Sequence, residues 1–509
     1  MFRTRRIHIK PTHPAYRYFL DNTSGTRAVR NQANFYIRNT MTGIKKSPEE
    51  RTLQETEVLH DVFTTIQKMN RDRALRLKKK LEDPKFKGKD PESCPELKKL
   101  IKACAPVPYP TAEKWLLSYG VLDAILKYTK NEAYYSCTSQ VNQQAIKKTC
   151  QSWKGYFSAR KEYRKAPGRF QAAPRIPGYI REKLSTAHFT SQVCRPVDVN
   201  GERFLHFANF GPVHVGPCSV HPGIFIKAEV RPYHGQFLLL LTYETEEEGE
   251  IDVPETAERI MGIDVGIGNF LACMDNTGER PLLIRGGWLK SRNQWFNKER
   301  ARLLGCLTKG TDSRHSVKHS RALDALSRKR SDRFRDFFYK TSHRICRICK
   351  DRRIEVIVIG HNEGQKDASD MGRTNNQNFV SIPYLEFIRT LKTVASRYGI
   401  AVAVTEESYT SKASLLGQDR IPAYGAKDNA CAFSGERIRR GLYRSGNGAV
   451  INADLNGAGN IARKVYPRAF SHCRSESLCR TPEVILCEDI LKIKRETKTR
   501  KEHTDKKAA

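Results

Sequence analysis

The sequence has no long apolar segment. No run of about 18 apolar residues occurs in it, and the opening MFRTRRIHIK has no apolar core of signal-peptide length. We therefore expect a soluble, intracellular protein that is neither secreted nor inserted in a membrane. In a reducing compartment its 14 cysteines should remain thiols.

Acidic side chains are also few. Asp and Glu number 55 against 90 Lys and Arg, which gives a formal net charge of +35. Such a surplus of positive charge along the whole chain is typical of proteins that bind a long polyanion. A ribosomal or chromatin-type protein is the simpler alternative, but 39% hydrophobic residues favour large globular cores. At 509 residues we expect a multidomain protein of roughly three domains.

The chain lacks the paired CxxC motifs of a zinc ribbon. Cys346 and Cys349 form the only CxxC, within HRICRICKD, and no second one exists. Because the segment continues a helical pattern, one face of a helix is favoured over a zinc site.

The spacing of apolar residues changes along the chain from strand to helix and back. RRIHIKP, residues 5–11, predicts an opening strand, and residues 181–255 predict further strands that it could join. Between them the pattern predicts helices, whose bounds we place at 27–40, 59–69, 71–81, 111–130 with an N-cap at Thr111, and a basic helix from Ser139 with Trp153 on its apolar stripe. This order predicts a barrel-like β domain interrupted by a helical one.

MGIDVGIGNF, residues 261–270, places a carboxylate, Asp264, near the end of a buried strand. A buried charge is costly unless it is compensated, and a divalent cation would compensate it. The alternative is that Asp264 only hydrogen-bonds the amides of the following turn.

The rest of the chain supplies further carboxylates in a recognisable order. PLLIRGGW continues the sheet, residues 294–335 are basic and helical, and IEVIVIG, a helix and IAVAVTEES then form a βαβ unit. Asp454 stands at the start of a helix over residues 451–465. This is the order of an RNase H-like nuclease fold, in which carboxylates from a first strand, a middle strand and a last helix meet. Three carboxylates suit two Mg²⁺ ions.

The motifs also resemble a known family. MGIDVGIGNF resembles the first RuvC motif, and NADLNGAGNI the third, of the TnpB nucleases of insertion sequences, their Fanzor relatives and type V CRISPR effectors. VIVIGHNEGQ, MGRTNNQNFVSIPYLEFIRTL, VTEESYTSKASLL and RIRRGLYRS resemble one TnpB subgroup and Fanzor. The likeness covers most of residues 255–466, with a weaker one in RRIHIKP and SQVNQQ. It implies Asp264, Glu407 and Asp454 as the catalytic and metal-binding residues, with two Mg²⁺ ions.

The third carboxylate departs from the usual pattern. Most of the family has a glutamate where this chain has Gly360, and the subgroup uses one on the next strand instead. The resemblance selects Glu407, three residues before Thr410, over its neighbour Glu406, and Glu363 is a further alternative.

A second departure concerns zinc. Many relatives have a zinc ribbon before the third motif, but Cys431 is the only cysteine between Thr410 and Asp454, so we expect no structural zinc. For nucleic-acid contacts the candidates on the matching motifs and basic segments are Gln143, Gln144, Trp153, Arg328, Lys329, Arg330, Arg373, Asn378, Lys412, Arg439, Arg440, Arg444 and Asn456.

These expectations give a multidomain α+β protein. The predicted parts are a wedge-type β-barrel (1–26 and 181–255), a helical recognition domain (27–180), a RuvC nuclease domain (256–409 and 450–466, with a basic helical region at 294–350), a nucleic-acid-binding lobe (410–449) and a basic, disordered tail (467–509).

The resemblance implies an RNA-guided DNA endonuclease whose partners are a non-coding guide RNA and double-stranded target DNA, as one monomer per RNA. It would cut next to a short flanking motif, in the nucleus if the protein is eukaryotic and in the cytoplasm or nucleoid if bacterial. The alternatives are a nuclease-silent, RNA-guided repressor and an RNA-independent transposase of the same fold.

Overall fold

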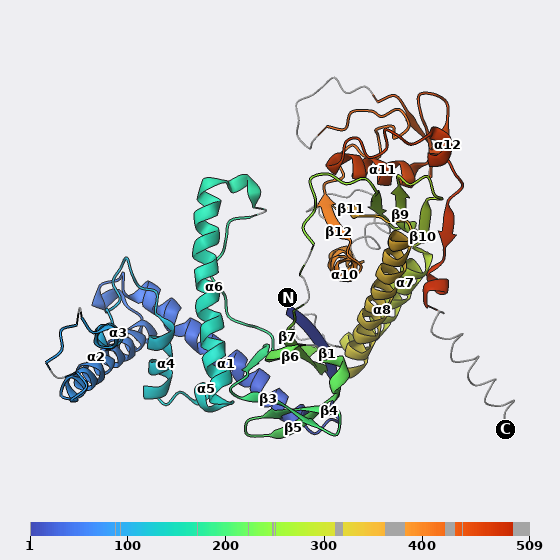
Figure 1. Ribbon diagram of the computed structural model, residues 1–509. Helices are drawn as coiled ribbons and strands as arrows, with labels where there is room; N and C mark the ends of the chain where they lie inside the picture. The colour runs from blue at the N-terminus through green and yellow to red at the C-terminus, as the bar shows by residue number, and fades with distance from the viewer. Residues whose placement is uncertain are drawn as a thin grey trace. The chain divides into compact units, whose positions relative to one another are not determined.

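The computed structural model of the protein describes all residues except 1, 87, 92, 171, 222, 247, 248, 250, 311–318, 362–381, 423–432, 440 and 492–509. The chain forms two compact units, Met1–Glu246 and Glu247–Ala509 (Figure 1). Within the described parts, no helix combines the length and the apolar character that crossing a membrane requires.

In the first unit, two antiparallel sheets share one core. The opening strand, predicted at 5–11, is β1 over Phe2–Ile9 and pairs along its whole length with β7, so the four-stranded sheet has the order β1-β7-β6-β2. The second sheet has the order β3-β4-β5. Phe189 and Phe207 from the two sheets meet Phe19 of α1 in the core. The strands are β1 Phe2–Ile9, β2 Ala187–Thr190, β3 Cys194–Val199, β4 Glu202–Phe207, β5 Gly211–Pro217, β6 Ile224–Tyr233 and β7 Gln236–Glu244.

The helices of this unit form a second core, and α1 belongs to both. Val29 and Ile37 of α1 pack with Leu122 of α4 and Trp153 of α6, while the same helix contributes Phe19 to the β core. Beyond Trp153, α6 has no buried residue. The helices are α1 Tyr16–Gly43, α2 Leu53–Leu81, α3 Pro95–Cys104, α4 Tyr119–Tyr128, α5 Glu132–Tyr135 and α6 Ser139–Lys165.

Three predictions of helix bounds are wrong. The helix expected at 27–40 is part of α1, which begins at Tyr16 and ends at Gly43. The two helices expected at 59–69 and 71–81 are the single helix α2, because no proline or glycine interrupts the chain at Asn70. The helix expected to begin after Thr111 begins at Tyr119 instead, where the side chain of Ser118 accepts a hydrogen bond from the Val121 amide. Thr111 caps only a short turn, through a hydrogen bond from the Lys114 amide.

The second unit is built on a six-stranded sheet of order β12-β11-β8-β9-β10-β16. Strands β8, β9 and β10 are antiparallel, whereas β11 and β12 run parallel to β8. With the crossover helix α10 between β11 and β12, this is the predicted RNase H-like arrangement, and the predicted multidomain α+β class is confirmed. The strands are β8 Ile260–Val265, β9 Asn269–Asp275, β10 Leu282–Arg285, β11 Val356–Gly360, β12 Ala401–Thr405 and β16 Glu483–Ile485.

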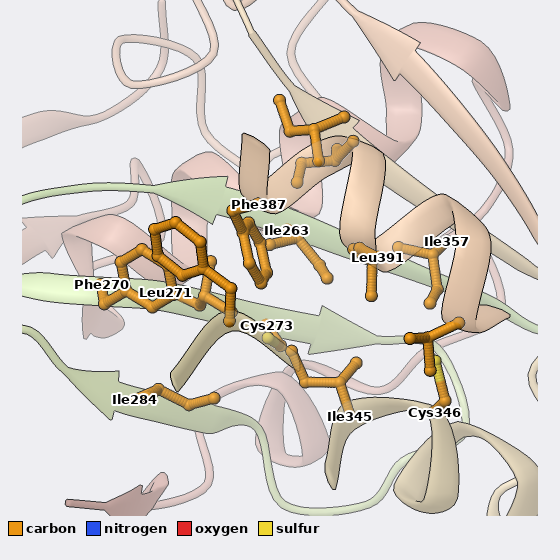
Figure 2. Close-up of a cluster of buried hydrophobic side chains, with 14 of the residues drawn as sticks. Ile263, Phe270, Leu271, Cys273, Ile284, Ile345, Cys346, Ile357, Phe387 and Leu391 are labelled. Carbon is orange, nitrogen blue, oxygen red and sulfur yellow. The ribbon is translucent and has the colours of Figure 1, made fainter. Parts of the chain in front are cut away.

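Helices cover both faces of this sheet (Figure 1). On one face α8 and α10 pack over alternate strand residues such as Ile263 and Ile357, and Figure 2 shows Ile345 of α8 and Phe387 and Leu391 of α10 beside them. On the other face α11 packs over Ile260, Val358 and their neighbours. The helices are α7 Gly287–Thr308, α8 Arg321–Asp351, α10 Tyr384–Ser396, α11 Ala453–Val465 and α12 Ser475–Leu478.

The CxxC pair belongs to the core. Cys346 and Cys349 lie in α8 with no exposed surface, and burial raises the pKa of the Cys346 thiol to about 12. The Sγ of Cys349 lies 3.6 Å from the Sδ of Met261 on β8. The helix interpretation of this motif is therefore confirmed.

Two segments differ from the sequence prediction. The basic helical region is two helices, α7 and α8, that extend beyond residues 294–335 on both sides. The tail after residue 466 is not irregular throughout, because Glu483–Ile485 forms β16 and pairs in parallel with β10. Three residues are too few to show a period in the sequence. The boundaries of the five predicted domains remain a proposal.

A small sheet of order β13-β14-β15 precedes α11, with strands β13 Glu436–Arg439, β14 Leu442–Arg444 and β15 Val450–Asn452. A cluster of hydrogen bonds fastens the segment before it. The carboxylate of Asp419 accepts from the amides of Ser414 and Ser434 at 2.7 and 3.0 Å, and Ser414 Oγ lies 2.7 Å from Ser445 Oγ. This cluster links three parts of the lobe without any cysteine. Cys431 lies outside the described residues, and the absence of zinc stays a prediction.

Candidate active site

Asp264 lies on the α11 face of the sheet because side chains alternate along β8. Ile260 of this strand packs beneath α11, whereas Met261 and Ile263 pack toward α8 and α10. Between them Gly262 has no side chain, and a Cβ there would collide with the carbonyl oxygen of Ala458 in α11. The missing side chain lets α11 approach β8 closely, which brings Asp454 toward Asp264.

Asp454 lies in the first turn of α11. The side chain of Asn452 caps this helix by accepting hydrogen bonds from the amides of Asp454 and Leu455, at 3.0 and 3.2 Å. A carboxylate in the first turn is also favoured by the helix dipole. Each oxygen of Asp454 faces a different partner: Nδ2 of Asn269 donates to Oδ2 at 2.8 Å, and Nη2 of Arg437 lies 3.7 Å from Oδ1.

Glu407 follows β12, the neighbour of β11. A Cβ built on Gly360, at the end of β11, would lie 2.7 Å from Cγ and 2.8 Å from Oε1 of Glu407. The side chain of Glu407 therefore occupies the space over Gly360 that a side chain at that position would fill. Thr410 holds the backbone in place, because its hydroxyl donates to the carbonyl oxygen of Glu407 at 2.8 Å.

Glu406 points elsewhere. One of its carboxylate oxygens accepts a hydrogen bond from Lys464 Nζ, and the other accepts from the Ser408 amide at 2.7 Å. Burial opposes ionisation of Glu406, but these hydrogen bonds prevail and lower its pKa. Glu406 is thus neutralised by a lysine, as expected if only one of the two glutamates faces inward. Glu363 lies outside the described residues.

The three carboxylates influence each other electrostatically. Burial raises the pKa of Asp264 to about 8, and the charges of Glu407 and Asp454 add to the shift, while Arg437 opposes it. Burial, Asp264 and Glu407 likewise raise the pKa of Tyr384, whose hydroxyl donates to the carbonyl oxygen of Gly266 at 3.0 Å. Converging anions of this kind fit hard divalent cations with oxygen ligands, because a cation would offset their repulsion. In the described part of the chain, no three His, Cys, Asp or Glu side chains are arranged closely enough to hold one ion together.

The structure contradicts the nucleic-acid prediction for two residues. Trp153 is fully buried, with its indole nitrogen donating to Asn34 Oδ1 at 2.9 Å. Asn456 is also fully buried, and its amide bonds the backbone of Leu415 and Ala413 at 2.9 and 2.8 Å. Both side chains stabilise the protein interior.

A third candidate, Arg330, has a packing role. Its guanidinium lies over the rings of Phe296 and Phe334 and donates to Asn293 Oδ1 at 2.9 Å, which ties α8 to α7. Gln143, Gln144 and Arg328 are half-buried, and the exposed candidates are Lys329, Lys412, Arg439 and Arg444. Arg373, Asn378 and Arg440 lie outside the described residues.

The sequence interpretation missed the polar residues around Asp454. Asn269 belongs to MGIDVGIGNF itself, and its position as a buried amide among apolar neighbours was the available signal. Arg285, whose Nη1 donates to Asn269 Oδ1 at 2.9 Å, and Arg437 lie on other strands. Their proximity could not be derived from spacing along the chain.

One family model matches a central segment of the chain. Residues 241–365 match the model of the family OrfB_IS605, described as "Probable transposase". This segment contains β8, β9, β10, α7, α8 and β11, and so includes Asp264 and Gly360. Over these residues the chain is similar to this TnpB-like family, and the predicted resemblance is confirmed. No curated protein matches the sequence.

Solved structures show only a distant likeness. A Cas12f1 complex with single-guide RNA and target DNA is 14% identical, with 90% of this chain and 99% of that chain covered and a TM-score of 0.29. The C2c1 of Alicyclobacillus acidoterrestris with single-guide RNA is 8% identical, with 92% and 88% covered and a TM-score of 0.35.

Proposed function

We propose that the protein is a Mg²⁺-dependent, RNA-guided DNA endonuclease. The observation that carries the nuclease assignment is that Asp264, Glu407 and Asp454 lie near enough at one edge of an RNase H-like sheet for their charges to interact, with Glu407 in the space over Gly360. A chain that had lost its activity would have no reason to keep a replacement for the missing glutamate. This favours a nuclease over a silent RNA-guided repressor.

The three carboxylates act together in this proposal. Asp264, whose pKa is raised by the charges of both others, would hold two Mg²⁺ ions together with Glu407 and Asp454. When bound, such a pair of ions activates a water molecule and stabilises the leaving 3′ oxygen in phosphodiester hydrolysis. Glu406 takes no part, because Lys464 neutralises it.

The nucleic-acid partners are inferred from charge and from the sequence motifs. A net charge of +35 exceeds what a single duplex contact would need, and suits a protein that holds both a guide RNA and a DNA target by their backbones. Lys412, Arg439 and Arg444 are exposed in the lobe beside α11 and are the candidates for contacts to the strand being cut. The flanking motif and one monomer per RNA belong to the same proposal.

The test is to purify the protein with its bound RNA, sequence that RNA, and present a DNA duplex that matches its guide. We expect Mg²⁺-dependent cleavage by the unchanged protein and none by Asp264→Ala, with RNA and DNA binding retained. Mg²⁺-dependent cutting that persists in a clean Asp264→Ala preparation would overturn the site.

A transposase that works without RNA is the second candidate, because the matching family is described as "Probable transposase". Such an enzyme would also use three carboxylates, but it would cut and join a transposon end. Digestion of the purified complex with RNase separates the two. Loss of cleavage supports RNA guidance, and cleavage that survives digestion favours the transposase.

A further inference from the structure

A chain of two hydrogen bonds links Asp454 to Asn269 and Asn269 to Arg285, and neither Asn269 nor Arg285 has a role in the proposed reaction so far. Nδ2 of Asn269 donates to Asp454 Oδ2 at 2.8 Å, and Oδ1 of Asn269 accepts from Arg285 Nη1 at 2.9 Å. Asn269 is only 8% exposed, so both ends of its amide are satisfied within the protein.

The arginine fixes the direction of the amide. A guanidinium can only donate hydrogen bonds, so the group of Asn269 that faces Arg285 must be the carbonyl oxygen. The amide NH₂ is then obliged to face Asp454. A flipped amide would place its oxygen against a carboxylate oxygen, and both contacts would be repulsive.

The fold places these residues side by side. Asn269 is the first residue of β9, and it pairs with Arg285, the last residue of β10, through a register shift between Ile284 and Arg285. A bulge of this kind re-aims the side chain that follows it. Behind it, Cys487 Sγ donates to the carbonyl oxygen of Arg285 at 2.7 Å.

We propose that Asn269 and Arg285 are positioning residues, which hold Asp454 by Oδ2 so that Oδ1 is presented to the cation. The inference rests on the proposed metal-dependent nuclease. It adds which oxygen of Asp454 binds the cation and which residues orient the Asp454 side chain. Oδ1 takes no part in the hydrogen bond with Asn269, and it faces the half-exposed guanidinium of Arg437 at 3.7 Å, a contact that a bound cation would replace. Residues that orient a metal ligand in this way contribute roughly 10–100-fold to metal affinity.

The test measures Mn²⁺ binding by electron paramagnetic resonance on the purified protein–RNA complex. Asn269→Leu keeps the side-chain volume and removes the hydrogen bond, and we expect it to weaken Mn²⁺ binding at one site by roughly 10-fold or more. Arg285→Met should act in the same direction with a smaller effect, because the amide stays but can flip. Arg285 is exposed, so this variant tests the inference even if Asn269→Leu fails to fold.

A matched control lies just beyond the other end of the same strand. Asn276 also uses its amide in the protein, accepting from the Ile260 amide at 2.9 Å and donating to the carbonyl oxygen of Glu258 at 2.7 Å. Asn276→Leu should lower the unfolding temperature in EDTA and leave Mn²⁺ affinity unchanged. An equal loss of affinity in both variants would assign the effect of Asn269 to general stability.

A double variant tests whether the two residues act in series. If Arg285 works through Asn269, adding Arg285→Met to Asn269→Leu weakens Mn²⁺ binding no further. Additive losses would overturn the proposed relay. Equal Mn²⁺ affinity in Asn269→Leu and the unchanged protein would overturn this inference alone, whereas failure of the unchanged protein to bind Mn²⁺ would overturn the proposed function with it.

Discussion

On one face of the six-stranded sheet, α8 and α10 pack over isoleucine, leucine and phenylalanine side chains, whereas on the other face α11 packs over glycine as well. The first face is covered mainly by apolar side chains and stabilises the unit through buried apolar area. The second gives up side-chain volume at Gly262 and Gly360, and in return a helix and a glutamate come close enough for the charges of Asp454 and Glu407 to act on Asp264. One face of the sheet thus mainly stabilises the fold, whereas the other carries the proposed active site. Substitutions on the first face should change stability, and substitutions on the second should also change cleavage.

The largest difference should appear between adjacent glutamates. Glu407→Gln should reduce cleavage by roughly a thousand-fold, because a lost metal ligand removes several kcal/mol of transition-state stabilisation. Glu406→Gln changes a residue that is paired with Lys464 and should retain most of the activity. Cleavage rates of the two variants at saturating Mg²⁺ provide the measurement, and equal rates would refute the assignment of Glu407.

Filling the space over Gly360 should have the next largest effect. Gly360→Ala would bring a Cβ to 2.7 Å from both Glu407 Cγ and Ile461 Cδ1, so the glutamate must move. We expect cleavage to fall by roughly a hundred-fold, as displacements of about 1 Å do in active sites. Ile359→Val, one residue earlier and on the opposite face, is the control and should cleave at nearly the normal rate. Full activity of Gly360→Ala would show that the position of Glu407 is not critical.

At Gly262 the effect should be on folding. Gly262→Ala would force a methyl group against the carbonyl oxygen of Ala458 and push α11 from the sheet. We expect the free energy of unfolding to fall by roughly 3 kcal/mol, in the range of overpacked cores. The control, Ile263→Val on the other face, should cost about 1 kcal/mol. Denaturant unfolding measures the free energy of unfolding of both variants. A smaller loss in Gly262→Ala than in Ile263→Val would contradict the close packing of α11 over Gly262.

The smallest effect concerns the unbound site and depends on pH. The pKa of Asp264 is about 8 in the folded protein, above its ordinary value of 3.8, so ionisation of this group opposes folding. Its penalty is absent below about pH 4 and grows as the pH rises to about 8. In EDTA, Asp264→Asn should therefore unfold at a temperature about 2 °C or more above the unchanged protein at pH 8, and at a similar temperature at pH 4.

Mg²⁺ should reduce the difference in unfolding temperature between Asp264→Asn and the unchanged protein at pH 8, because it should stabilise the unchanged protein. A difference that is the same at both pH values would show that Asp264 is not destabilised by its neighbours. The two pH values therefore serve as controls for each other.

Strong periodic signals made much of the second unit predictable from the sequence. IEVIVIG and the start of IAVAVTEES are continuous apolar runs, so β11 and β12 could be placed, and the resemblance selected Glu407 by its spacing from Thr410. In the structure the charge of Glu407 acts on Asp264, while the catalytic role of both residues remains a proposal. Trp153 and Asn456 were misassigned because polarity and motif position do not reveal which way a side chain points.

Contacts between distant segments could not be predicted. Asn269 and Arg285 meet only through a bulge, and the register of β9 and β10 is set by packing that the sequence does not display. The three residues of β16 carry no periodic signal, and their place in the sheet follows from pairing with β10.

That last strand has a practical meaning for anyone who shortens or extends this protein. Glu483–Ile485 completes an edge of the sheet, and nearby Cys487 holds the backbone of Arg285, which in turn holds Asn269 against Asp454. A segment that looks dispensable in the printed sequence is thus linked through hydrogen bonds to the proposed active site. Tags and fusion partners are best attached after Leu491, which packs against the core, and a version trimmed before Pro482 would lack the edge strand of this sheet.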